Sequence, residues 1–272
     1  MDIKVFAEKV ADVVSGLTYD VNVSVQEVVK NNNVKYTGIV VREIGSAIGE
    51  TIYINDMYEK GYSVERAGKE VMEIVKNNKK PDIDVNFFKD YEQVKDKLRA
   101  KLVNISNEQY AGISAAEYGY DDLKIVPYVK INFGENSGSI NILDEHVKTW
   151  NVDIKDIVKT ALENIKDDYD IQSMSDFLGA MGMPGMDTPG FDIVTNSEKM
   201  YGAIGVIAAK ETLHDKYPEG YTVIPSSVHE MLVLDKRLVE SGGMQLANMI
   251  KEVNASCVAP EEILGDHEYT FV

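Results

Sequence analysis

The chain has 272 residues, of which 44% are hydrophobic and 27% are charged, as in ordinary globular proteins. Its 45 acidic and 28 basic residues give a formal net charge of -17, which repels phosphate backbones and anionic lipid surfaces. These values argue against direct binding to nucleic acid or to a membrane. An acidic surface that imitates nucleic acid is the alternative, but the acidic residues are scattered along the chain, which favours plain solubility.

The beginning of the chain predicts a helix rather than an export signal. Residues 1–17 are charged throughout, and Ile3, Phe6 and Val10 recur at helical spacing. No segment approaches the roughly 20 apolar residues that a membrane span requires. The single cysteine, Cys257, cannot form a disulfide within the chain, which favours a reducing compartment. We therefore predict a cytoplasmic protein.

Three segments of the chain share one pattern, in which two strands are followed by a helix. In each segment, apolar residues that alternate along two short runs give way to apolar residues at helical spacing. The predicted strand pairs are VKYTGIVV with ETIYIND, IVPYVKINF with SINIL, and YTVIPSS with EMLVLD. The helices begin near Ser63, Asp153 and Leu246. Ser63 suits a helix cap, because its hydroxyl accepts a free amide of the first turn.

These three units predict the fold class. An amphipathic helix over a single hairpin buries little surface, so the units are expected to share sheets or to stack. The sequence therefore predicts an α+β fold, with mixed or antiparallel sheets and helices packed on one face. Further helices over residues 85–102 and 197–214 are predicted to link the units. A last strand is predicted in HEYTFV, at the end of the chain.

The segment MSDFLGAMGMPGMDTPG, residues 174–190, predicts a loop because it combines four glycines, two prolines and four methionines. It divides the chain into a first lobe, residues 1–173, with two of the units, and a second lobe, residues 191–272. Its glycines match neither type of phosphate-binding loop, so no nucleotide cofactor is predicted. Flexible methionines suit adaptable contacts with a partner, with a plain linker as the alternative, and the candidates are Met181, Met183 and Met186.

The segment PSSVHE, residues 225–230, places two serines, a histidine and a glutamate within an apolar stretch. His229 and Glu230 resemble the start of a zinc-protease helix, but position 233 is valine, where the second histidine would stand. The four histidines lie far apart in the sequence, without ligand spacing between any two. The sequence therefore predicts neither a metal ion nor another cofactor.

A serine hydrolase is the alternative for the same segment. Ser226 or Ser227 would be the nucleophile and His229 the base, with an acid such as Asp266 to orient the imidazole. In extended backbone, Glu230 points away from the face of His229, and no Gly-x-Ser-x-Gly elbow surrounds the serines. The proline before them interrupts strand pairing, and serine hydroxyls satisfy loose backbone groups in turns. A strand, a turn and a second strand are therefore the favoured interpretation.

The C-terminal third resembles a known family. The resemblance is carried by Thr195-Asn196, by the PSSVHE segment, and by Asn254 with VAPEE at residues 258–262, in this order. Over residues 190–272 the chain is similar to uncharacterised proteins of Gram-positive gut bacteria and their mobile elements, catalogued as a domain of unknown function. The resemblance implies a cytoplasmic bacterial protein encoded on a mobile element. It supplies no reaction, cofactor or partner.

We expect a non-catalytic protein that binds or regulates another protein, encoded by the host or by the mobile element. The missing catalytic constellation, the acidic charge and the methionine-rich segment favour this function. Besides the methionines, the polar residues Glu230 and His267 are candidates for contacts with the partner. The alternative function is a hydrolase that depends on serine and histidine.

Overall fold

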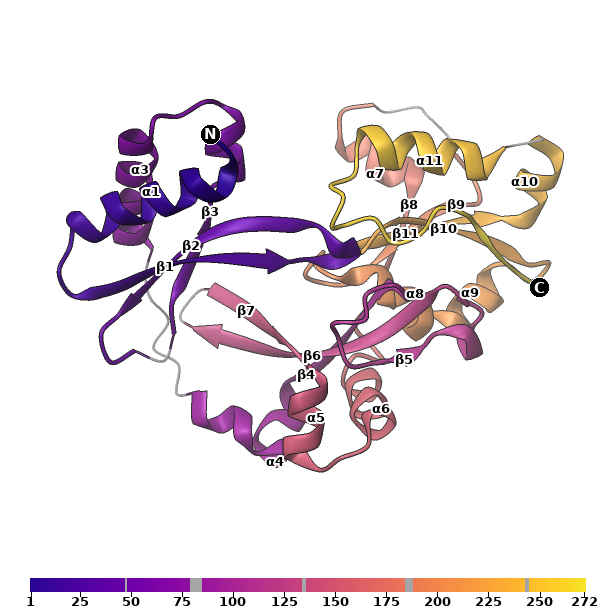
Figure 1. Ribbon diagram of the computed structural model, residues 1–272. Helices are drawn as coiled ribbons and strands as arrows, with labels where there is room; N and C mark the ends of the chain where they lie inside the picture. Colours follow the sequence, from indigo (N-terminus) through magenta and orange to yellow (C-terminus); the bar gives the residue numbers. More distant parts are fainter. Residues whose placement is uncertain (47, 79–84, 134–135, 184–187, 243–244) are drawn as a thin grey trace. The chain divides into compact units, whose positions relative to one another are not determined.

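The computed structural model describes residues 1–46, 48–78, 85–133, 136–183, 188–242 and 245–272. The chain forms two compact units, Met1–Val85 and Asn86–Val272 (Figure 1). The predicted division at residues 174–190 lies inside the second unit. None of the helices in the described ranges is both long and apolar enough to cross a membrane.

The first unit contains a three-stranded antiparallel sheet in the order β1-β2-β3. Strand β1 was not predicted, because its apolar alternation in VNVSV breaks at Gln26-Glu27. The elements are α1 (Ile3–Gly16), β1 (Val21–Val29), η1 (Asn31–Asn33), β2 (Lys35–Glu43), β3 (Glu50–Tyr53), α2 (Asn55–Glu59) and α3 (Val64–Asn77).

One apolar core holds the first unit together. Phe6 of α1 and Val71 of α3 are buried in the same cluster as Ile39 of β2, so both long helices cover the sheet. The hydroxyl of Ser63 accepts the amide of Arg66 at the start of α3, which confirms the predicted cap. Such a cap stabilises a helix by about 1 kcal/mol.

The second unit begins with a four-stranded antiparallel sheet, in which β6 pairs with β4, β5 and β7. Helices α5 and α6 follow β7 along the chain. The elements are η2 (Val85–Lys89), α4 (Tyr91–Val94), η3 (Lys95–Lys97), β4 (Leu98–Asn104), β5 (Ile113–Ser114), η4 (Ala116–Tyr118), β6 (Leu123–Phe133), β7 (Asn136–Asn141), α5 (Asp144–Trp150) and α6 (Ile154–Asn164).

The predicted helix over residues 85–102 is wrong. Short helical turns occupy its first part, and β4 begins at Leu98, where Leu98 pairs with Val129 of β6. The strand was concealed in the sequence by Lys101, a charged residue in a position that is only 2% exposed. Its ammonium group donates to Asn141 at 2.7 Å, so the sheet itself supplies a partner for the buried charge.

A five-stranded antiparallel sheet completes the second unit, in the order β12-β10-β11-β9-β8. The last predicted strand is present as β12. The elements are β8 (Asp170–Ser173), α7 (Met174–Ala180), β9 (Phe191–Thr195), η5 (Gly202–Ile204), α8 (Gly205–Ala208), α9 (Lys210–Lys216), β10 (Tyr221–Ser227), β11 (Glu230–Asp235), α10 (Lys236–Gly242), α11 (Leu246–Ser256) and β12 (Tyr269–Phe271).

Two segments between these strands differ from the prediction. In the predicted helix at 197–214, residues 197–201 are not helical, because Lys199 and Tyr201 adopt left-handed backbone conformations with φ of 53° and 55°. The rest of the segment is divided into η5, α8 and α9. The predicted loop at 174–190 begins with helix α7. The hydroxyl of Ser173 accepts the amide of Asp176 and caps this helix, a local signal that outweighs the glycines further along.

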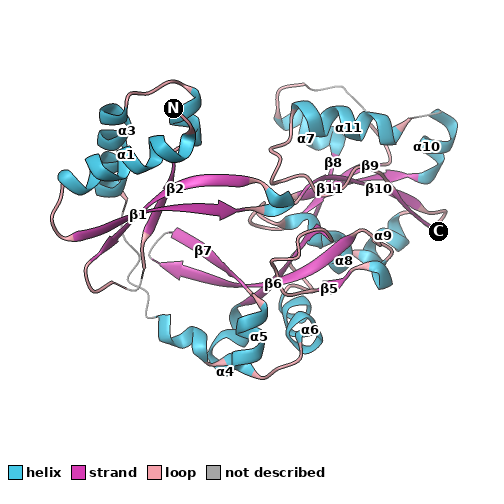
Figure 2. Ribbon diagram, in the orientation of Figure 1, coloured by secondary structure: helices cyan, strands magenta, loops and turns pink. Residues whose placement is uncertain are grey.

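The α+β class is confirmed, and the five-stranded sheet carries helices on both faces (Figure 2). On one face, Val223 and Val233 belong to the large core of the second unit, together with Leu213 of α9. On the other face, Ile224 packs with Ile250 of α11 in a smaller cluster. Alternate residues of one strand therefore belong to two different apolar layers.

The three predicted hairpins are present as β2-β3, β6-β7 and β10-β11, and the helices α3, α6 and α11 follow them. In each of the three repeats, a short helix stands between the hairpin and the long helix; these short helices are α2, α5 and α10. The chain therefore repeats one order of elements three times, once in the first compact unit and twice in the second.

Close packing at Gly68 makes a testable prediction for the first unit. A Cβ at this position of α3 would lie 2.5 Å from Val13 Cγ1 and 2.9 Å from Val13 Cβ, and the latter atom cannot rotate away. Overpacking costs about 1–3 kcal/mol, whereas a Gly→Ala change gains about 1 kcal/mol in helix propensity. The difference is a net loss of up to about 2 kcal/mol. We expect Gly68→Ala to destabilise the first unit by this amount, measured as faster hydrogen exchange of the α1 and α3 amides.

Gly16→Ala is the matched control, because a Cβ there would meet nothing within 4 Å. It lies at the end of α1 and is expected to leave exchange unchanged or to slow it. Equal protection of α1 and α3 in both variants would contradict the importance of the contact between Gly68 and Val13.

Candidate functional site

The serines of the PSSVHE segment support a turn between β10 and β11. The strand register shifts between Pro225 and Ser227, and Ser227 pairs with Glu230 across the turn. The hydroxyl oxygen of Ser227 accepts the amide of His229 at 3.1 Å, and the hydroxyl of Ser226 donates to Glu230 Oε1 at 3.2 Å. The strand, turn and strand of the favoured interpretation are therefore present, and both hydroxyls bond within them.

The imidazole of His229 is held by two segments outside the hairpin. Its Nδ1 accepts the amide N–H of Tyr201 at 3.1 Å, so the neutral ring carries its proton on Nε2, which faces Glu262 Oε1 at 3.4 Å. The ring also stacks on the ring of Tyr201, with centroids 5.7 Å apart. The carbonyl oxygen of His229 accepts the hydroxyl of Thr195 at 2.8 Å. The residue is thus bonded through its ring and its backbone.

The contacts of His229 differ from those of the base in a serine hydrolase. Among the hydrogen bonds of the described residues, neither Ser226 nor Ser227 bonds to the imidazole of His229. A base in a serine hydrolase is oriented through Nδ1 by an acid, whereas here a backbone amide occupies Nδ1. Asp266 contacts a different histidine, His267. The structure therefore does not bring the four candidate residues together as a catalytic relay.

The segments that carry the family resemblance meet at this hairpin. The amide of Val228 donates to the backbone oxygen of Glu262 at 2.9 Å, which joins the 258–262 segment to the turn. The side chain of Asn196 bonds to both the amide and the carbonyl of Met200 and closes the loop that leads to the stacked tyrosine. Sequence reasoning missed Tyr201 and Glu262 as partners of the histidine, since nothing in their local sequence marks them.

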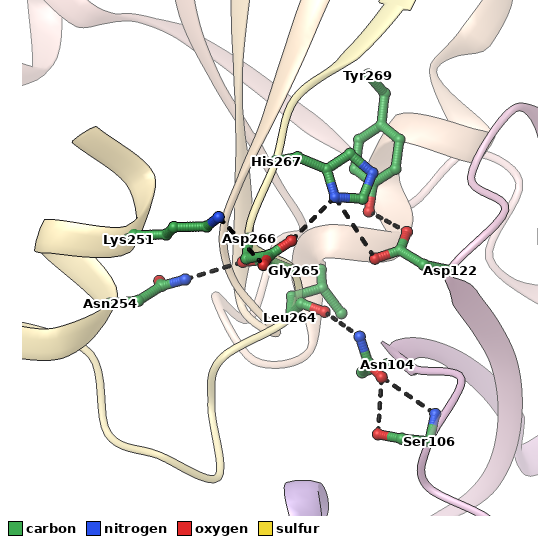
Figure 3. Close-up of polar contacts among 10 residues, drawn as sticks. All are labelled: Asn104, Ser106, Asp122, Lys251, Asn254, Leu264, Gly265, Asp266, His267 and Tyr269. Carbon is green, nitrogen blue, oxygen red and sulfur yellow. Dashed lines mark hydrogen bonds and ion pairs between the residues drawn. The ribbon is translucent and has the colours of Figure 1, made fainter. Parts of the chain in front are cut away.

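A second polar group, the acid–histidine cluster, consists of Asp121, Asp122, Asp266 and His267. His267 Nδ1 lies 3.1 Å from Asp266 Oδ1 and 4.0 Å from Asp122 Oδ2 (Figure 3). The hydrogen bond to Asp266 raises the pKa of His267, partial burial opposes the rise, and the charges of Asp122 and Asp121 add to it. Among the described residues, Asp121, Asp122 and His267 are placed to hold a metal ion. Sequence analysis did not identify the two aspartates, because no local pattern marks them.

Hydrogen bonds from neighbouring side chains hold Asp122 and the backbone before His267 in place (Figure 3). The hydroxyl of Tyr269 donates to Asp122 Oδ1 at 2.6 Å, and burial and this hydrogen bond raise the pKa of Tyr269, so its proton stays in place. Asn254 donates to the carbonyl oxygen of Gly265 at 2.8 Å, and Asn104 donates to that of Leu264 at 3.3 Å. The backbone before His267 is therefore tied to two separate elements, α11 and β4.

An apolar pocket of about 600 Å³ lies beside the hairpin, between the five-stranded sheet and the helices α10 and α11. Ser226 and Asn254 are among its lining residues, so the pocket adjoins both the hairpin and the backbone of the acid–histidine cluster. The described lining consists of Thr188, Pro189, Phe191, Ile224, Pro225, Ser226, Leu232, Leu234, Leu238, Met249, Ile250, Val253 and Asn254. The pocket was not predicted, because its walls come from five elements, β9, β10, β11, α10 and α11.

The five interaction candidates from the sequence do not lie together in one site. Met181 and Met183 follow helix α7 and are 62% and 44% exposed. Met186 lies outside the described residues. Glu230 is half-buried and bonded to Ser226 within the hairpin, and His267 belongs to the acid–histidine cluster.

The fold and these sites define an α+β protein of antiparallel sheets, with an apolar pocket beside a hydrogen-bonded hairpin. The chain belongs to a family of unknown function, DUF5688, whose model matches residues 3–272 and so covers both compact units. This match confirms the predicted membership of an uncharacterised domain family and extends it beyond residues 190–272. No curated protein and no solved structure matches the chain.

The bond from Thr195 to the turn predicts the effect of an isosteric substitution. Thr195→Val removes the hydroxyl that donates to His229 O at 2.8 Å. Because an unpaired group in a buried position costs about 1–3 kcal/mol, we expect a loss of this size in the free energy of unfolding. The measurement is urea unfolding followed by the fluorescence of Trp150, which lies in the core of the second unit.

Thr222→Val on strand β10 of the same sheet is the control. The hydroxyl of Thr222 is 3.5 Å from that of Thr270, at the outer limit for a hydrogen bond, so its loss is expected to cost less than about 0.5 kcal/mol. If both valine variants lose the same stability, the contact between Thr195 and the turn does not hold the hairpin.

Proposed function

We propose that the protein is a non-catalytic binding factor whose apolar pocket receives apolar side chains of a partner protein. The observation that carries the proposal is the chemistry of the pocket wall. The described residues that line about 600 Å³ of space include no charged side chain. Pockets of this size and apolar character are typical of binding sites.

The opening of the pocket favours a protein as the occupant. Met249 and Val253 stand four residues apart on α11 and are 47% and 44% exposed. A small molecule within the pocket would leave both side chains in water, whereas a protein surface across the opening would cover them. Methionine also adapts its shape to different apolar partners.

The polar groups at the pocket support binding without catalysis. The hydroxyl of Ser226 donates to Glu230, and the amide group of Asn254 donates to Gly265 O. Both side chains therefore serve the local structure. The hydrogen bonds of the described residues include no pair of nucleophile and base at this pocket.

The surface charge and the family resemblance guide the choice of partner. A chain with a net charge of -17 selects a partner whose apolar side chains are surrounded by neutral or basic residues. We place the interaction in a bacterial cytoplasm, with a partner encoded by the host or by a mobile element. A single cysteine, exposed and without a disulfide, suits that compartment.

Charged substitutions at the opening test the pocket directly. Met249→Glu and Val253→Glu are each expected to weaken the binding of Nile red, a neutral apolar dye, by at least tenfold in a fluorescence titration. Burial of a methionine or valine side chain against a ligand contributes about 1.5–3 kcal/mol to binding, and a loss of about 1.4 kcal/mol weakens binding tenfold. Met200→Glu is the matched control, because Met200 is 52% exposed and does not line the pocket.

A photo-crosslinking residue at position 253 then identifies the partner in a bacterial lysate. The purified partner is expected to displace Nile red and to bind Met249→Glu at least tenfold more weakly than the unchanged protein or Met200→Glu. Equal affinity of the partner for all three proteins would overturn the proposal. Dye binding that no captured protein displaces would instead identify a small-molecule site.

A further inference from the structure

The acid–histidine cluster brings metal-ligating groups together from two distant parts of the second unit. Asp121 and Asp122 precede β6, and Asp266 and His267 precede β12. One ligand atom from each of Asp121, Asp122 and His267 lies within 4.8 Å of the others. We propose that this cluster binds a divalent transition-metal ion, with His267 Nδ1 and the carboxylates of Asp121 and Asp122 as ligands and with Asp266 beside them.

The spacing of the donor atoms suits one ion. Nδ1 of His267 is 3.1 Å from Asp266 Oδ1 and 4.0 Å from Asp122 Oδ2. An ion bound at about 2.0–2.2 Å from each ligand holds its donors about 3–4.4 Å apart. The donor atoms of Asp121, Asp122 and His267 lie within 4.8 Å of one another, a few tenths of an ångström beyond this range. Asp121 is exposed and the side chain of His267 is 43% exposed, so both side chains can move closer to an ion.

Groups behind the ligands orient Asp122. The hydroxyl of Tyr269 donates to Asp122 Oδ1 and leaves Oδ2 as the atom nearer the imidazole. Tyr269 itself is 5% exposed, and its ring packs against that of Tyr120 at 4.9 Å, so this support is rigid. Metal-ligating carboxylates in proteins are commonly held by such outer hydrogen bonds.

The charges and ligand types indicate the class of ion. Three carboxylates surround one imidazole, and the ammonium group of Lys251 lies 3.8 Å from Asp266 Oδ2. A divalent cation would balance this excess of negative charge. An imidazole nitrogen with carboxylate oxygens suits Zn²⁺, Co²⁺ or Mn²⁺, whereas Mg²⁺ and Ca²⁺ prefer oxygen ligands alone. The proposal is independent of the apolar pocket and of its occupant.

Isothermal titration of the full chain with ZnCl₂, after treatment with a chelator, tests the site. We expect one saturable equivalent of Zn²⁺ in the unchanged protein and at least tenfold weaker binding in His267→Ala and Asp122→Asn. Tyr269→Phe keeps every ligand and removes only the outer hydrogen bond, so it is expected to weaken binding by about tenfold or more. Visible absorption of bound Co²⁺ should fall in the same variants.

His214→Ala is the matched control, because His214 is exposed on α9 and lies outside the cluster. It is expected to bind Zn²⁺ like the unchanged protein, and far-UV circular dichroism checks that each variant is folded. Binding that persists unchanged in folded His267→Ala and Asp122→Asn would show an adventitious ion only, and would overturn the proposal. Absence of binding at millimolar Zn²⁺ would equally overturn it and leave the cluster as an ion-pair network.

Discussion

His229 joins three segments of the second unit that are distant in the sequence, two through its ring and one through its backbone. Its ring nitrogens contact Tyr201 and Glu262, and its carbonyl oxygen accepts the hydroxyl of Thr195. A Cβ at Gly202 would lie 2.3 Å from Thr195 Oγ1 and 2.6 Å from His229 O, so only glycine permits this close approach of η5 to the turn. The positions of β9, η5 and the C-terminal segment therefore depend on one hydrogen-bonded turn, since unpaired polar groups in buried positions cost free energy.

The fold was predictable from the sequence wherever the period of apolar residues was plain. The three hairpins and the helices α3, α6 and α11 follow directly from such patterns. Strand β4 was not predictable, because Lys101 places a charge at a buried position that contacts with distant residues, among them Asn141 and Tyr201, make tolerable. The segment at 197–214 has helical composition, yet its helices begin only after Tyr201, whose left-handed backbone bonds to the hairpin. In both cases tertiary contacts outweighed local preference.

The candidate site was predictable only where its partners are close in sequence. The proline and serines of the PSSVHE segment indicated a turn, and Ser227 indeed bonds to a residue two positions away. The partners of His229, in contrast, stand 28 and 33 residues away and carry no local mark. The same holds for Tyr269 and Asp122, which are 147 residues apart. Proximity of this kind is a product of strand order, which a single sequence does not reveal.

The segment at residues 258–268 connects the hairpin to both proposed binding sites. The backbone oxygen of Glu262 accepts the amide of Val228 in the turn. Three residues later, the carbonyl oxygen of Gly265 accepts the side chain of Asn254, which also lines the apolar pocket. The acid–histidine cluster begins at the next residue. A partner in the pocket would contact Asn254, whose side chain bonds to the backbone directly before the two cluster residues Asp266 and His267. Val228 and His229 of the hairpin bond to that stretch through Glu262, whereas the hydroxyls of Ser226 and Ser227 bond within the hairpin. Polar groups therefore gather at the hairpin for structural contacts, without forming a catalytic relay.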